Sequence, residues 1–93
     1  MNRQKIITLI GFAIKSRNIV FGEDQIKSLT KQALVIIDSS SSEKYIERVK
    51  RFAKTNEVII VNELSSLTNR DNVHSIAILD MNLANGIKES LDN

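Results

Sequence analysis

A run of five consecutive apolar residues, Ala33–Ile37, constrains the fold of this chain more than any other feature of its sequence. Three of the five are β-branched, and Asp38 and four serines follow directly. This pattern is typical of a strand that is buried on both faces of a sheet. Because such a strand needs helices above and below it, the run predicts a layered α/β domain.

Three further segments have the apolar, β-branched character of strands: Ile19–Phe21, Val58–Val61 and Ser75–Leu79. We interpret Val58–Val61 as a second buried strand, because it is apolar throughout. The four segments together predict a central sheet with helices on both faces. In this sheet we expect four side chains to be almost fully buried, those of Val35, Ile37, Ile59 and Ile78.

Amphipathic helix patterns alternate with the strands, and several of them begin with a capping residue. Asn2 is the expected N-cap of the first helix. Ser40 and Glu43 have the spacing of a capping box, so we expect the third helix to begin there. Asp80 or Asn82 is the expected cap of the last. The predicted helices are 2–16, 23–30, 40–55, a single turn at 63–68, and one that begins at 80 or 82.

Length and composition indicate one globular domain. A chain of 93 residues has room for a single hydrophobic core, so we expect one domain over residues 1–93. Hydrophobic residues make up 42% and charged residues 26%, which is ordinary for a folded protein. The absence of cysteine fits a reducing compartment, and we expect a cytoplasmic protein. No signal-peptide pattern and no apolar stretch of the roughly 20 residues needed to span a bilayer is present, so no membrane association is expected.

Little in the sequence points to catalysis. His74 is the only histidine and has no carboxylates at ligand spacing, so we expect no metal and no cofactor. The three glycines are isolated, so no glycine-rich phosphate loop is formed. Asp38 stands at the end of a buried strand, where α/β folds often place active groups, but a turn or capping role is the favoured interpretation. We therefore expect no catalytic residue and no small-molecule substrate.

The basic residues allow an RNA partner without demanding one. The 13 basic and 11 acidic residues give a net charge of +2. Lys15 and Arg17 end the first predicted helix, and Lys27 and Lys31 lie on or just beyond the second. If the first strand is short, both pairs should fall near the turn at Gly22, where the amide groups that begin the next helix could receive a phosphate. The alternative is that these side chains only solvate two helix faces, and spacing alone favours that alternative.

Three segments carry a family resemblance that covers nearly the whole chain. They read LIGFAIKSRNIVFG at residues 9–22, LVIIDSS at 34–40 and IAILD at 76–80. They resemble the L-seven-Ae and L-thirty-e family of ribosomal proteins, and within it the small bacterial YlxQ-like members. The resemblance implies a three-layer α-β-α sandwich with a central mixed four-stranded sheet. It also implies a non-catalytic protein that binds kink-turn RNA, a sharply bent duplex.

The family reads RNA with a G-x-N-E-x-x-K motif at a strand-to-helix turn and with a second contact from the loop before the last strand. Gly22 matches the glycine, and Glu23 fills the variable second position. Asp24 replaces the asparagine and adds negative charge near phosphate. Gln25 replaces the glutamate but keeps an acceptor oxygen for a guanine edge. Ser28 occupies the lysine position, and Lys27 lies one residue earlier.

Carried onto this chain, the resemblance implies an RNA-binding protein, associated with the ribosome or with another structured RNA. The residues expected to contact RNA are Lys15, Arg17, Gly22, Glu23, Asp24, Gln25, Lys27, Lys31 and, from the second loop, Leu67 and Arg70. The departures from the motif leave an alternative open. In that alternative the fold is retained, kink-turn binding is lost, and the domain serves as a protein-interaction adaptor.

Overall fold

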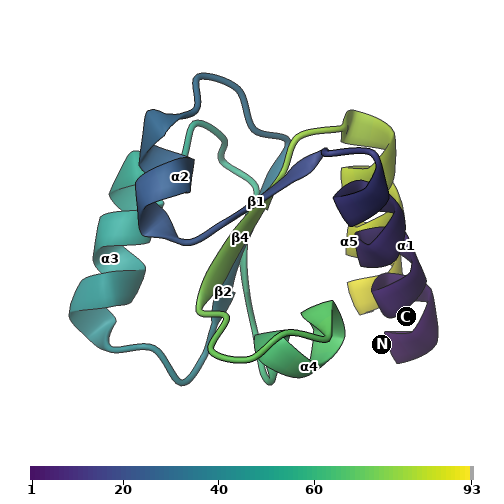
Figure 1. The fold of residues 1–93 in the computed structure, drawn as a ribbon. Helices are drawn as coiled ribbons and strands as arrows, with labels where there is room; N and C mark the ends of the chain where they lie inside the picture. Colours follow the sequence, from purple (N-terminus) through teal and green to yellow (C-terminus); the bar gives the residue numbers. More distant parts are fainter. Residues whose placement is uncertain (93) are drawn as a thin grey trace.

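The computed structural model describes residues 1–92, which form a sheet with helices on both sides (Figure 1). Helices α1 and α5 cover one face, and α2 and α3 cover the other. The predicted α/β class with a mixed four-stranded sheet is confirmed. In chain order the elements are α1 (Arg3–Lys15), β1 (Ile19–Phe21), α2 (Glu23–Ser28), β2 (Leu34–Asp38), α3 (Glu43–Phe52), β3 (Val58–Val61), α4 (Leu64–Thr68), β4 (Ser75–Ile78) and α5 (Met81–Asp92).

The strands lie in the order β1-β4-β2-β3, so β4 and β2 are central and β1 and β3 are the edges. β2 and β3 run parallel, as expected for strands joined by a crossover helix, and β4 runs antiparallel to both of its neighbours. Every residue of β2 and β4 is buried, which confirms that the apolar run at Ala33–Ile37 marks a strand covered on both faces.

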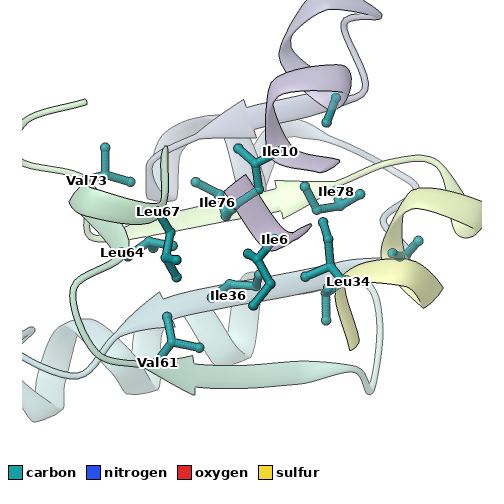
Figure 2. Close-up of a cluster of buried hydrophobic side chains, with 14 residues drawn as sticks. Ile6, Ile10, Leu34, Ile36, Val61, Leu64, Leu67, Val73, Ile76 and Ile78 are labelled. Atoms are coloured by element: carbon teal, nitrogen blue, oxygen red, sulfur yellow. The ribbon is translucent and has the colours of Figure 1, made fainter. Parts of the chain in front are cut away.

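Alternate residues of the central strands enter two separate cores. Ile36 and Ile76 face α1 and α5, and Figure 2 shows them with Ile6 and Ile10 of α1 in one apolar cluster. Leu64 and Leu67 of α4 belong to this cluster too. On the other face, Val35, Ile37 and Ala77 pack with Ile26 of α2 and Val49 of α3. The protein is therefore held together by one large and one smaller hydrophobic core.

The prediction that β3 is a buried strand was wrong. Val35, Ile37 and Ile78 are 0% exposed as predicted, but Ile59 is only half-buried and Ile60 is 44% exposed. In β3 only Val61 is buried. The physical reason is the sheet order, because β3 has a strand neighbour on one side alone.

The helix caps agree with the sequence at two of three positions. The Asn2 side chain accepts from the Lys5 amide, and Asp80 accepts from the Leu83 amide at 2.9 Å. The predicted capping box at Ser40 and Glu43 was wrong. Ser42 is the N-cap of α3, because its hydroxyl accepts from the Tyr45 amide at 3.2 Å. Four serines in a row offer several possible caps, and the turn after β2 decides which one is used.

None of the helices in residues 1–92 combines the length and the apolar character needed to cross a membrane.

Candidate nucleic-acid interface

The turn at Gly22 is set by its backbone. Gly22 has φ +87° and ψ 159°, a conformation that is essentially restricted to glycine. Its amide donates to the carbonyl of Ser75 at 2.9 Å, and its carbonyl accepts from Ile26 at 3.1 Å. The turn is thereby tied to the first residue of β4 on one side and to α2 on the other. A Cβ at Gly22 would meet nothing within 4 Å, so the backbone angle, rather than crowding, requires glycine here.

Glu23 is engaged in a two-point ion pair between α2 and α3. Arg48 donates through Nε at 3.0 Å and through an Nη at 3.2 Å to the two carboxylate oxygens of Glu23. Mainly because of these hydrogen bonds, the pKa of Glu23 lies below its ordinary value and the pKa of Arg48 above it. The pair neutralises one of the two acids in the first turn of α2 and leaves Asp24 exposed.

The exposed side chain of Gln25 holds the same turn by a hydrogen bond at the surface. Its side-chain oxygen Oε1 accepts from the backbone amide of Phe21 at 3.2 Å. One of the two lone pairs of the oxygen expected to read a guanine edge is therefore already in use. The side-chain NH₂ of Gln25, which is exposed, remains as a donor.

The loop before β4 is shaped by two asparagines in the left-handed conformation, Asn69 at φ 55° and Asn72 at φ 57°. Asparagine tolerates this region better than most residues. Ser65 holds the loop against α4, since its carbonyl accepts from the Arg70 amide at 3.1 Å and its hydroxyl from the Val73 amide at 2.8 Å. The loop therefore has a defined shape.

The Gly22 turn and this loop come together around one hollow of about 310 Å³. It is lined by Phe21, Gly22, Tyr45 and the segment from Arg70 to Ser75. The guanidinium carbon of Arg70 lies 4.3 Å from the centroid of the Phe21 ring, which places a cation on the aromatic face. Two segments that are far apart in the sequence, each expected to contact RNA, thus share one surface.

Tyr45 and His74 form a further wall of the hollow that the sequence analysis missed. Tyr45 and Ser75 are joined by a hydrogen bond of 2.7 Å between their hydroxyls. The rings of Tyr45 and His74 meet edge to face at 5.9 Å, and Ser41 Oγ lies 3.4 Å from His74 Nδ1. Tyr45 and Ser75 meet because β2 and β4 run antiparallel, which brings the start of the helix after β2 close to the start of β4. No local pattern predicts that arrangement.

The basic residues that were expected to contact RNA beside Gly22 lie in different parts of the surface. β1 runs antiparallel to β4, with the Gly22 amide bonded to Ser75 and the Asn18 carbonyl to the Leu79 amide. Lys15 lines a neighbouring hollow together with Asn69 and Arg70. Arg17, just before Asn18, lies at the opposite end of β4 from the hollow at Gly22. Lys31 belongs to that end too, because nearby Ala33 donates to Ile78. The expected basic cluster at the Gly22 turn is not formed.

Lys27 and Leu67 also lie away from the hollow. The ammonium of Lys27 sits 4.9 Å from the centroid of the Phe52 ring, on the surface between α2 and α3. Leu67 is 1% exposed in the larger core, so its expected contact with RNA is not available in this structure. Of the ten predicted contact residues, Gly22 and Arg70 line the hollow itself. Glu23, Asp24 and Gln25 follow directly in the adjoining helix turn.

Asp38 has the turn role that the sequence favoured. It is 6% exposed and accepts from the amide of Leu64 at 2.7 Å, from the amide of Ser40 at 3.0 Å and from the Ser40 hydroxyl. Burial raises the pKa of Asp38, but the hydrogen bonds outweigh it, so the pKa lies below its ordinary value. The carboxylate joins the end of β2 to the start of α4. Within residues 1–92, no three histidine, aspartate or glutamate side chains are grouped as a metal site would need.

Comparison with known proteins supports the fold and adds no activity. No protein-family model and no curated protein matches the chain. Among solved structures, a protein with unknown function from Bacillus halodurans matches over 96% of this chain and 98% of its own, with a TM-score of 0.73 and 19% sequence identity. A likeness at that identity concerns the fold alone.

Proposed function

We propose that this protein binds structured RNA, without catalysis, through the hollow between the Gly22 turn and the loop at residues 69–74. One observation supports this most. The two segments that the resemblance assigns to RNA lie against each other, joined by the contact between Arg70 and Phe21. Because the rest of the site is built from backbone turns with defined hydrogen bonds, little of it would need to order on binding.

The groups around the hollow suit recognition of bases more than neutralisation of many phosphates. Asn72 and His74 are exposed and can donate or accept, and the NH₂ of Gln25 is free to donate. Arg70 offers a flat cation that stacks on a base or binds a phosphate. Its charge is balanced locally by the exposed Asp71. Bulged or splayed-out bases, which present their edges and flat faces, fit this set of groups better than a regular duplex.

The RNA we propose is a kink-turn or a similarly bent element, in the ribosome or in another cytoplasmic ribonucleoprotein. Asp38 takes no part in chemistry in this proposal, since hydrogen bonds to Leu64 and Ser40 already use its carboxylate. Within residues 1–92, Arg70 is the one lysine or arginine that lines this hollow, and Lys15 lines the next one. We therefore expect the salt dependence of binding to correspond to only a few phosphate contacts.

The test is a titration of a standard kink-turn RNA and of an unkinked duplex of matched length and composition, at several salt concentrations. The proposal expects tighter binding of the kink-turn at every salt concentration, with a shallow slope of log affinity against log salt. Equal and weak binding of both RNAs would overturn it, and the adaptor alternative would then lead. Sequencing of RNA crosslinked to the protein in its own cells would identify the natural ligand.

A further inference from the structure

A second hollow lies beside the one at Gly22, between α1 and the end of α4. It has a volume of about 380 Å³, within the range of roughly 300–1,000 Å³ that is usual for ligand pockets. Ile7 and Ile14 form its α1 wall. Ile10 and Leu67, each 1% exposed, form its floor, where they belong to the larger core (Figure 2). We call this hollow the α1 groove, and its lining is mainly apolar.

Gly11 opens the middle of the α1 groove. It lies within α1, where glycine is less stable than alanine because its backbone loses more freedom on folding. Gly86 in α5 has a packing reason, since a Cβ there would lie 3.0 Å from Cδ1 of Leu9. A Cβ at Gly11 would meet nothing within 4 Å, and Gly11 lacks the positive φ that would call for glycine. The fold therefore does not require this glycine, and its effect is to leave helix backbone uncovered at the groove.

Two cations and no carboxylate line the α1 groove. Lys15, the last residue of α1, and Arg70 are both exposed, and neither forms a salt bridge in the part of the chain that the structure describes. Asp71, the acid next to Arg70, lines the hollow at Gly22 but not the α1 groove. The groove therefore suits a ligand that combines an apolar face with negative charge.

The α1 groove is continuous with the proposed RNA surface. Arg70 lines both the groove and the hollow at Gly22, so the two are separated by a single side chain. The segment between them has a defined shape, because Asn69 is held at φ 55° and the Arg70 amide donates to Ser65. A strand of RNA that passes the Gly22 hollow would meet the groove next. This continuity favours RNA over a free small molecule as the occupant.

We propose that the α1 groove receives one unpaired nucleotide of the same RNA, beyond the bases that meet the hollow at Gly22; this inference rests on the RNA-binding function proposed above. The flat face of the base lies against Gly11 and the isoleucines on either side of it, and Lys15 and Arg70 bind the flanking phosphates. Asn69, exposed at the rim, can donate to or accept from the edge of the base.

Filling the groove is the first test, by titration of the full chain with the standard kink-turn RNA. Gly11→Leu should weaken binding at least about tenfold, because its side chain occupies the space of the base. Thr8→Leu is the matched control, since Thr8 is exposed on α1 and does not line the groove. Gly11→Ala should also weaken binding while it stabilises the protein, so unfolding would not explain the loss. Equal affinities of Gly11→Leu and Thr8→Leu would overturn the inference.

The phosphate contact is tested by the salt dependence of binding. Lys15→Gln should make the slope of log affinity against log salt shallower by about one unit or slightly less, because one phosphate contact is lost. Lys5→Gln removes an equally exposed lysine of α1 that does not line the groove, and it should leave the slope nearly unchanged. Equal slopes for the two variants would contradict the proposed contact at Lys15.

A photo-crosslink locates the nucleotide directly. The kink-turn RNA carries 4-thiouridine at one unpaired position at a time, and the irradiated complex is digested with trypsin. Residues 6–15 form one tryptic peptide that contains the α1 wall, whereas residues 18–27 form the peptide of the Gly22 turn. We expect one position to crosslink within residues 6–15, and this crosslink should disappear in Gly11→Leu. Crosslinks confined to other peptides would overturn the inference.

The two proposals fail in different ways. If the wild type binds the kink-turn and the unkinked duplex equally weakly, the proposed function fails, and the occupant of the groove with it. If the wild type prefers the kink-turn, but Gly11→Leu binds it as Thr8→Leu does and no crosslink falls within residues 6–15, only the groove inference fails.

Discussion

The guanidinium of Arg70 lies on the ring of Phe21, with 4.3 Å between its central carbon and the ring centroid. Phe21 directly precedes Gly22, so this contact joins the loop before β4 to the turn before α2. Arg70 is nevertheless exposed and keeps its charge for a ligand. A cation held in place before binding loses less conformational freedom on binding than a free side chain does.

Replacing Arg70 tests whether this cation contacts RNA. We expect Arg70→Gln to weaken kink-turn binding roughly tenfold and to make the salt slope shallower by about one unit or slightly less, because one phosphate contact is lost. The measurement is the titration at several salt concentrations described above. Lys27→Gln is the control, since Lys27 lies on the Phe52 ring, and it should change the slope little. If Lys27→Gln makes the slope shallower and Arg70→Gln does not, RNA binds to the α2–α3 surface instead.

Restoring the family motif should tighten binding. In the double variant Asp24→Asn, Gln25→Glu, one carboxylate oxygen at position 25 can still accept from the Phe21 amide, as Gln25 does now. The second oxygen is then wholly free for a guanine edge, and its charge makes it a stronger acceptor than the remaining lone pair of the glutamine oxygen. We expect tighter binding of the kink-turn with little change for the unkinked duplex. Equal effects on both RNAs would argue against a base contact at position 25.

Two glycines should respond in opposite ways to alanine. Gly22→Ala should destabilise the protein by about 1–3 kcal/mol, because a side chain is strained at φ +87°. Gly11→Ala should stabilise it by roughly 0.5–1 kcal/mol, because Gly11 lies within α1 and an added Cβ meets nothing within 4 Å. Urea denaturation measures both changes. A neutral Gly22→Ala would mean that the turn can adopt another conformation.

Asp38 should contribute to stability in a pH-dependent way. Its pKa in the folded protein lies below the ordinary value of 3.8. The ionised carboxylate therefore stabilises the fold fully above that ordinary value, and this contribution is lost as the pH falls through the folded pKa. At neutral pH, Asp38→Asn should cost about 1–3 kcal/mol, because an NH₂ group would replace an oxygen that accepts hydrogen bonds. Urea denaturation at a series of pH values should show a smaller acid loss in this variant.

Two serines beside Asp38 provide a second test and a control for that measurement. Ser40→Ala removes a hydroxyl that donates to the carboxylate, so the folded pKa of Asp38 should rise and the acid loss should begin at higher pH. Ser39→Ala removes a hydroxyl bonded to Asn62 instead, so it should leave the pH dependence unchanged. An identical pH profile for the wild type and Asp38→Asn would mean that another group causes the acid loss.

The elements of this fold were predictable because their signals are local. The apolar run at Ala33–Ile37 marks β2, Asn2 caps α1, and Gly22 ends β1 at a turn that needs its backbone freedom. Asp38 was predictable as a turn residue for the same reason, since it bonds to Ser40 two residues away. In each case, residues close together in the chain determine the outcome.

The errors concern residues whose surroundings come from distant parts of the chain. Val58–Val61 is as apolar as β2, yet it forms an edge strand, because apolar composition does not specify a strand's neighbours. Arg17 is only a few residues from Gly22, yet β1 separates the two, because β1 runs antiparallel along β4. Leu67 lies in the segment that the resemblance assigned to RNA, yet it belongs to α4 and its side chain packs in the larger core.

The sequence by itself determined which segments form helices and strands and where several of them begin. Hydrophobic periodicity and capping side chains act over a few residues, and both can be read along the chain. The tertiary structure alone decided the strand order, the open edge at Ile60 and the meeting of Gly22 with Arg70. These depend on how the helices and strands pack together, and many residues far apart in the chain share that packing energy.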